Sequence, residues 1–197
     1  MTEIFDEPTA IVPVEPQPAA VFNPVSGTTA FDLAQRMSKA LASSDLVPDA
    51  FRGNVANCLI ALEISTRLNM APLMVMQNLH IIHGRPSWSS QFIIAAINSS
   101  RRFTTLKFEF NKDRTSCTAY ATERATGEVI RGATVTLEMA SVEGWSTKKG
   151  SKWATMPELM LQYRAAAFFG RVYCPEILNG LYSEQEAMDI ATTNAQD

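Results

Sequence analysis

Apolar residues recur three and four positions apart through much of the first hundred residues, which is the period of a helix with one buried face. We predict helices over residues 28–43, 53–68, 73–78 and 87–98. Thr28 or Thr29 is the expected N-cap of the first helix, and Ser87 is that of the fourth. The apolar side of the first helix consists of Phe31, Leu33, Ala34, Met37 and Leu41.

After residue 102 the alternation changes to a period of two, which predicts β-strands. Three alternating segments, 103–110, 116–122 and 129–136, are joined by short turns, so a three-stranded antiparallel meander is expected. A smaller hairpin is expected where the β-prone run 79–83 ends at Gly84-Arg85-Pro86.

Thr155-Met-Pro-Glu158 has the pattern of a capping box, in which two side chains satisfy backbone N–H groups at a helix start. The helix that it predicts extends to about Val172, and a weaker helical pattern follows over residues 183–190. The expected fold is therefore α+β: N-terminal helices, then the three-stranded antiparallel meander, backed by the C-terminal helix.

The charge is distributed unevenly, which changes what the net value of −3 implies. Residues 26–171 contain all 17 Lys and Arg residues but only 11 of the 20 acidic ones, so this part carries six surplus positive charges between two acidic ends. Five of the ten prolines lie in the first 27 residues. We therefore divide the chain into a flexible, acidic, proline-rich arm (1–27), one basic domain (28–182) and an acidic tail (183–197).

No motif predicts a catalytic or metal site. The GxxxxGK[ST] phosphate loop is absent, and His80 and His83 have no Cys, Asp or Glu close by in the sequence. Cys58, Cys117 and Cys174 are far apart and are expected to be buried and reduced. Because no apolar run approaches the ~20 residues that span a membrane, we expect a soluble, cytoplasmic protein that is no enzyme and needs no cofactor or metal.

The densest basic cluster, Lys148, Lys149 and Lys152, lies in a segment that is flanked by Trp145 and Trp153. Mobile lysines suit phosphate groups and aromatic rings suit stacked bases, so the combination favours single-stranded nucleic acid. A solvated surface loop is the alternative for the lysines. Trp145 and Trp153 could both be core anchors, both be stacking platforms for bases, or be one of each.

Further cations accompany this cluster. Arg164 and Arg171 lie two turns apart on one face of the predicted C-terminal helix, where they would meet backbone phosphates or the acids of a neighbouring subunit. A structural salt bridge is the alternative for either arginine. The remaining candidates for DNA contact are Arg101, Arg102 and Lys107 at the start of the meander, and Arg85 and Trp88 at the hairpin.

Several short motifs occur in a characteristic order. They are Gly144-Trp145, Lys152-Trp153, Met156-Pro157, Met160-Leu161, Arg164-Ala165-Ala166, Arg171 and Pro175-Glu-Ile-Leu-Asn-Gly180, preceded by Asn57-Cys58-Leu59, Pro72 and Gly84-Arg85-Pro86-Ser87-Trp88-Ser89. In order and spacing these motifs resemble those of the RecT family of phage single-strand DNA annealing proteins. The resemblance covers about residues 30–180.

The resemblance implies ATP-independent binding of single-stranded DNA and annealing of complementary strands in phage homologous recombination within the bacterial host cell. It also implies assembly into a ring or helical filament and a phage 5′→3′ exonuclease as partner. Family members often contact the host single-strand binding protein through a longer C-terminal region, whereas here only an acidic tail follows Gly180.

Other functions stay open for a basic domain of this kind. The protein could bind single strands without annealing them, or it could be a structural or assembly protein that contacts acidic neighbours; a nuclease is a third alternative. Opposite charge adds a hypothesis: the acidic tail occupies the basic groove when DNA is absent.

Overall fold

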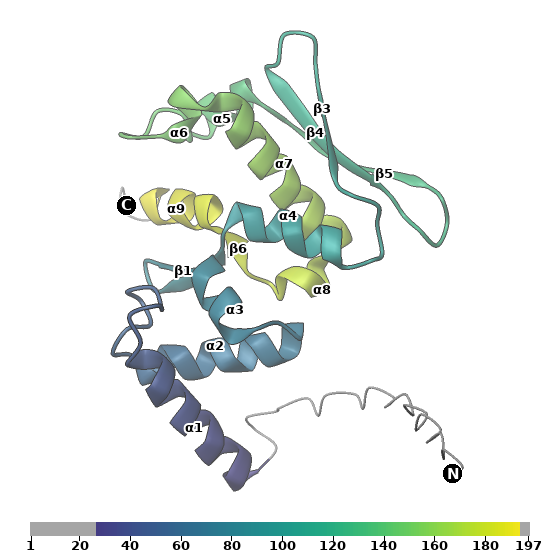
Figure 1. Cartoon of the computed structure of the whole chain (residues 1–197). Coiled ribbons are helices and arrows are strands. Elements are labelled where there is room, and N and C mark those ends of the chain that lie inside the picture. The colour runs from purple at the N-terminus through teal and green to yellow at the C-terminus, as the bar shows by residue number, and fades with distance from the viewer. Residues whose placement is uncertain (1–26, 194–197) are drawn as a thin grey trace, which may run out of the picture.

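The N-terminal helices form where the apolar spacing predicts them in the computed structural model, which describes residues 27–193. They are α1 (Thr28–Ala42), α2 (Val55–Leu68), α3 (Pro72–Asn78) and α4 (Ser90–Ser99). α1 packs against α2 at one end of the molecule (Figure 1). The side chains of Asn54 and Ser89 cap α2 and α4 by accepting hydrogen bonds from backbone N–H groups. Nearly all of the predicted arm lies outside the described residues.

Two predicted helix starts are wrong by one to a few residues. Gly27, rather than Thr28 or Thr29, is the N-cap of α1, and no side chain caps this helix. Ser87 does not cap α4, because it belongs to strand β2 (Arg85–Trp88) and is paired there with β1 (Leu79–Ile82). The predicted hairpin is thereby confirmed, and it extends two residues further than its turn motif indicated.

α1 buries a different face from the one that its large apolar residues predicted. Ala34, Ser38 and Ala42, each four residues apart, are buried, whereas Phe31 and Met37 are among the exposed side chains. Residues four apart lie on one stripe of a helix, and small side chains on that stripe allow close packing on α2. Phe31, Leu33 and Met37 are left on the surface, whereas Leu41 is half-buried against the core.

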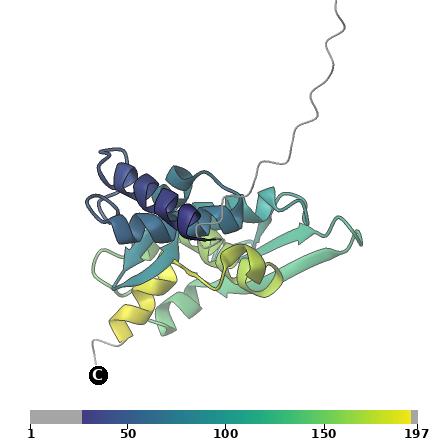
Figure 2. The same cartoon turned by 90° about the horizontal axis from the view of Figure 1, so that it is seen from below.

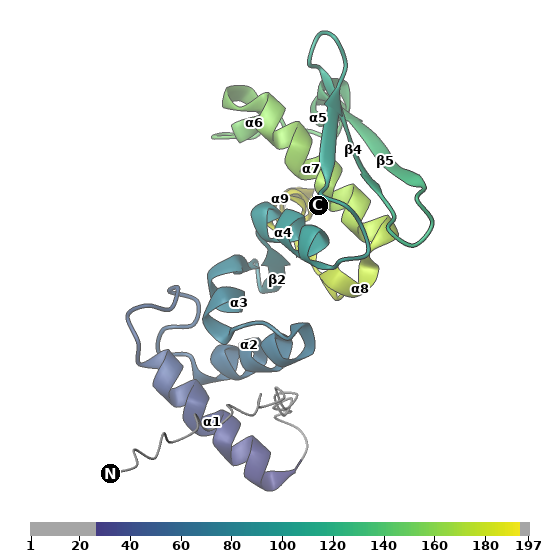
Figure 3. The same ribbon diagram turned by 45° about the vertical axis from the view of Figure 1, so that its right-hand side comes forward.

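The predicted meander is confirmed as a sheet of β3 (Lys107–Phe110), β4 (Ser116–Thr122) and β5 (Val129–Thr136), with β4 in the centre. Strand β3 is shorter than predicted, since Phe103 makes only an isolated bridge to Glu123. α7 (Pro157–Tyr173) covers one face of β4 and β5 (Figure 3). Gly132 allows this approach, because a Cβ there would lie 3.3 Å from the Cβ of Phe169. The C-terminal helix therefore backs the sheet, as expected.

The capping box predicted at the start of α7 does not form. Thr155 is the last residue of α6 (Lys152–Thr155), and Met156 precedes α7 without a capping side chain. Glu158 pairs instead with Arg114 of the β3–β4 turn, at 2.5 Å. Neither α6 nor α5 (Leu137–Val142) was predicted, because so few residues do not establish an apolar period.

The C-terminal segment returns to the N-terminal hairpin. α8 (Pro175–Leu178) is followed by β6 (Tyr182–Ser183), which pairs in parallel with β2, and then by α9 (Glu184–Thr193). α9 packs against β1 and β2 (Figure 2). The weak helical pattern over residues 183–190 is thus confirmed, and the described part of the acidic tail lies against the rest of the protein.

None of the helices within residues 27–193 is both long and apolar enough to cross a membrane by itself. α2 and α3 reach that length and composition only together, and they are bent by 110° at the break between them.

Trp88 fastens this C-terminal segment to the N-terminal part. Its side chain is fully buried, its ring stacks on Phe92 with centroids 4.2 Å apart, and its Nε1–H donates to the Leu178 carbonyl at 3.1 Å. A buried N–H group is costly unless it has an acceptor, so this bond selects the observed position of α8.

Replacement of Trp88 by Phe should lower the free energy of unfolding by about 1–3 kcal/mol, because the fully buried site loses volume and the Leu178 carbonyl keeps only its hydrogen bond from the Leu181 N–H. Urea denaturation followed by circular dichroism measures this change. Val142→Ala is the control: Val142 is 79% exposed, so its replacement should change the stability by no more than about 0.5 kcal/mol. Equal effects of the two substitutions would contradict the anchoring role of Trp88.

Candidate nucleic-acid interface

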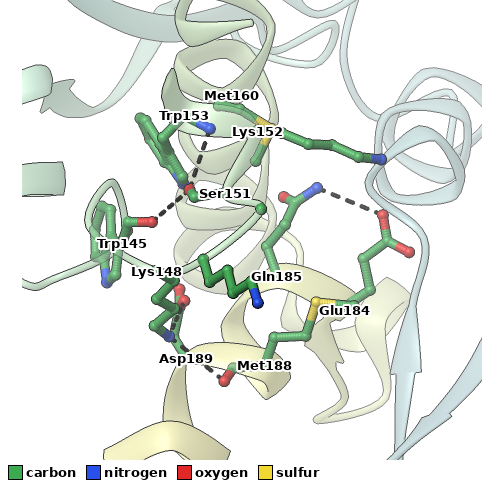
Figure 4. Close-up of a pocket in the computed structure, with 12 residues that line it drawn as sticks. Trp145, Lys148, Ser151, Lys152, Trp153, Met160, Glu184, Gln185, Met188 and Asp189 are labelled. Atoms are coloured by element: carbon green, nitrogen blue, oxygen red, sulfur yellow. Dashed lines mark hydrogen bonds and ion pairs between the residues drawn. The ribbon is translucent and has the colours of Figure 1, made fainter. Parts of the chain in front are cut away.

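Two tryptophans fix the loop that carries the lysine cluster, residues 145–153, named here the Trp–Lys loop. The rings of Trp145 and Trp153 lie 5.5 Å apart and are only 8% and 6% exposed. Ser151 Oγ donates to the Trp145 carbonyl at 2.6 Å and accepts from the Trp153 N–H at 3.3 Å (Figure 4). Both rings therefore belong to the core, and their role is to hold the loop rather than to offer a stacking surface.

The three lysines of the Trp–Lys loop differ in their surroundings. Lys148 is half-buried, and its Nζ lies 2.7 Å from Asp189 Oδ1. Lys149 and Lys152 are exposed, and neither has an ion-pair partner within the described part of the chain. Two cations are thus displayed to solvent by a loop whose backbone is held in place.

A cavity of about 360 Å³ separates the Trp–Lys loop from α9. All three lysines of the loop contribute to its wall, as do Gln185 and Met188 from α9 (Figure 4). A second cavity of about 340 Å³ shares Lys152 and Gln185 with the first and is lined by further amide side chains. The wall of the first cavity is mostly apolar and also carries the Glu184 and Asp189 carboxylates, whereas the second cavity is mostly polar. The feature that suits a charged polymer is therefore the exposed lysines at the border of these cavities.

Arg164 and Arg171 are both engaged by acids of the same chain. Arg164 is 4% exposed and pairs with Asp189, while its guanidinium carbon lies 3.8 Å from the centre of the Trp145 ring. Arg171 pairs with Glu186. The structural salt bridge, an alternative left open by the sequence, is therefore present for both arginines. Their partners come from α9 and not from a second subunit.

The other candidate residues lie on separate elements and do not line the cavity beside the Trp–Lys loop. Arg102 is held by Glu123 at 3.1 Å, and hydrogen bonds from Thr126 and Arg102 lower the pKa of the Glu123 carboxyl, so this pair stays charged. The full burial of Trp88 excludes base stacking in this conformation. Arg85, Arg101 and Lys107 are exposed on β2, after α4 and on β3.

The cations of this site are paired with two acids of α9, Glu186 and Asp189. Sequence reasoning did not single out these two residues. They lie three residues apart on α9, so both side chains project from one side of the helix. The spacing of acids within the weak helical pattern was the sequence signal that could have placed both carboxylates on one face of a helix. Only the fold reveals that this side meets Lys148, Arg164 and Arg171.

Within residues 27–193 the three thiols are buried, and the acids and histidines form no metal-binding group. Burial raises the pKa of the Cys117 and Cys174 thiols to about 11 and raises the pKa of Cys58 as well. No group of three His, Cys, Asp or Glu side chains between residues 27 and 193 could hold a metal ion. His80 lies beside Glu184, with Nε2 3.3 Å from Oε2.

Comparisons of the chain with protein-family models, with curated proteins and with solved structures return no match. What the site can do must therefore be argued from its own geometry and from the sequence motifs.

The thiols should be unreactive in the folded protein. The thiolate is the reacting species, and a thiol of pKa about 11 contributes only about one thiolate in a thousand at pH 8. With a disulfide reagent at pH 8, we expect colour release from the three cysteines only after guanidinium is added. Rapid release of one equivalent from the native protein would contradict their burial.

Proposed function

We propose that this protein binds single-stranded DNA through the Trp–Lys loop and anneals complementary strands without ATP, in homologous recombination. The observation that carries the proposal is the pair of exposed cations, Lys149 and Lys152, on a loop fixed by two buried tryptophans. The motifs that resemble the RecT family run through this same loop and α7. Geometry and resemblance therefore support the same activity.

The arrangement suits phosphate contact better than base contact. Lysine ammonium groups attract phosphates without reading the sequence. The aromatic rings nearby are buried in the loop's support, so the bases of a bound strand would be left free. A strand held by its backbone, with unstacked base edges exposed, can pair with a second strand. This is the property that annealing requires and that tight base stacking would oppose.

Assembly of many copies belongs to the proposal, because one loop with a few cations contacts only a short piece of DNA. A ring or helical filament would repeat the loop along the strand and multiply weak contacts into stable binding. A 5′→3′ exonuclease that exposes single strands is the expected partner, and the host single-strand binding protein is a second.

The first test replaces both exposed lysines, in the variant Lys149→Gln/Lys152→Gln. Removing one lysine–phosphate interaction should reduce the slope of log affinity against log salt by about 0.7, so the double variant should show a reduction of about 1.4. Fluorescence anisotropy of a labelled oligothymidine over a salt series measures the slope. Lys39→Gln/Lys112→Gln, which removes the same charge from α1 and from the β3–β4 turn, should leave it unchanged. Equal slopes for all three proteins would remove the loop from the site.

The second test separates annealing from simple binding. Complementary oligonucleotides that carry a fluorophore and a quencher are mixed without nucleotide, and the protein should accelerate quenching well above the spontaneous rate. Binding without acceleration would indicate a protective single-strand binding protein. Absence of binding at moderate salt would favour an assembly protein, and magnesium-dependent loss of DNA would indicate a nuclease.

A further inference from the structure

α9 pairs with three of the cations that the sequence predicted to contact DNA. Asp189 Oδ1 lies 2.7 Å from Lys148 Nζ (Figure 4). Its Oδ2 contacts the Arg164 guanidinium, and Glu186 contacts Arg171. Two oxygens of one carboxylate thus bridge cations from two different elements, the Trp–Lys loop and α7. The two non-bridging oxygens of a backbone phosphate could make the same pair of contacts.

The position of α9 also places it over the site. Glu184, Gln185, Met188 and Asp189 form the wall of the cavity that faces the Trp–Lys loop. Lys149 and Lys152 remain exposed at its border. A strand that approaches the loop therefore meets these two exposed lysines first, whereas Lys148 and Arg164 are covered by the Asp189 carboxylate. Arg171 is exposed and lies outside this cavity.

The contacts that hold the C-terminal segment to the rest of the protein differ before and after Gly180. Before this point, α8 is anchored by the Trp88–Leu178 hydrogen bond. Asn179 and Gly180 then turn the chain with positive φ values of 49° and 73°. After it, β6 contributes only two residue pairs with β2, Ser87 with Tyr182 and Trp88 with Ser183. The segment from β6 onwards is thus held by this short pairing, by its ion pairs, by the Ser90–Gln185 hydrogen bond at 2.9 Å and by the buried side chain of Ala187.

We propose that α9 is an acidic cover of the DNA site, whose Asp189 and Glu186 carboxylates occupy the places that strand phosphates take when DNA displaces the helix. This inference rests on the proposed function. A tethered carboxylate has a high effective concentration at the site, so a single free phosphate competes poorly with it. A strand delivers several linked phosphates at once and displaces the cover. The acidic cover therefore favours the binding of polymers over that of mononucleotides.

Asp189 is the position at which to test the cover. Glu186 also supports the start of α9, where its Oε2 accepts hydrogen bonds from the Ser183 N–H and hydroxyl. Its replacement would therefore disturb the helix itself. Asp189→Asn removes one negative charge and leaves an oxygen that can accept from Arg164.

Asp189→Asn should bind a labelled oligothymidine about fivefold more tightly than the parent protein at low salt, because the competing charge is gone. The two affinities should converge as salt rises, so the salt slope steepens by up to about 1.4 for the two cations released. The charge-matched control is Glu128→Gln, an exposed acid in the turn between β4 and β5, which should change neither quantity. If Asp189→Asn bound the oligonucleotide equally or more weakly, the proposal that α9 covers the site would be overturned. Asp189 would then be a residue that positions the cations.

Hydrogen exchange on the unaltered protein tests the same idea without a substitution. Amides of residues 184–193 should exchange faster once oligothymidine is bound, and greater protection of them would overturn the inference. The two proposals fail differently. If DNA binds through Lys149 and Lys152 but α9 is not released, the proposed function stands and the cover fails. If neither the parent nor Asp189→Asn binds the oligonucleotide, both fail.

Discussion

The carboxylate of Asp189 joins α9 to two elements that precede it in the chain, the Trp–Lys loop and α7. It pairs with Lys148 of the Trp–Lys loop and with Arg164 of α7, and Arg164 in turn lies against the Trp145 ring. Arg164 is 4% exposed, and a buried guanidinium has lost hydration that only a close anion can offset. The sequence of α7 therefore requires an acid at this point. α9 supplies it, which brings the C-terminal helix, the loop and the cavity between them into one arrangement.

This constraint changes the meaning of the charge distribution. The basic middle and the acidic end are separate along the chain, and opposite charge alone was the basis for the hypothesis that the tail occupies the basic groove. In the fold, acids from the end neutralise part of the basic surface, and two lysines of the loop stay exposed. The buried tryptophans hold the loop in shape, so lysines are presented at low cost in backbone entropy. Phosphate contact without base contact is what this arrangement favours.

Much of the fold could be predicted because its patterns are local. Alternation over 116–122 and 129–136 matched β4 and β5 at both ends, since each strand has one face under α7 and one in solvent. Predictions failed where neighbours compete for the same residues. Ser87 belongs to a paired strand and does not cap α4. Thr155 is the last residue of α6, a helix too short to show an apolar period, and does not cap α7. On α1, large apolar residues suggested the buried face, but packing on α2 selected the small ones.

By itself, the sequence determined the α+β class, the meander, the basic middle between acidic ends and the lysine cluster beside two tryptophans, because each is a property of residues close together in the chain. Only the tertiary structure decided that both tryptophans are buried, that Arg164 and Arg171 meet acids of their own chain, and that Lys149 and Lys152 stay exposed. Burial and ion pairing depend on what packs against a residue. Here the partner is α9, which a parallel pairing of two residues with β2 places beside the loop.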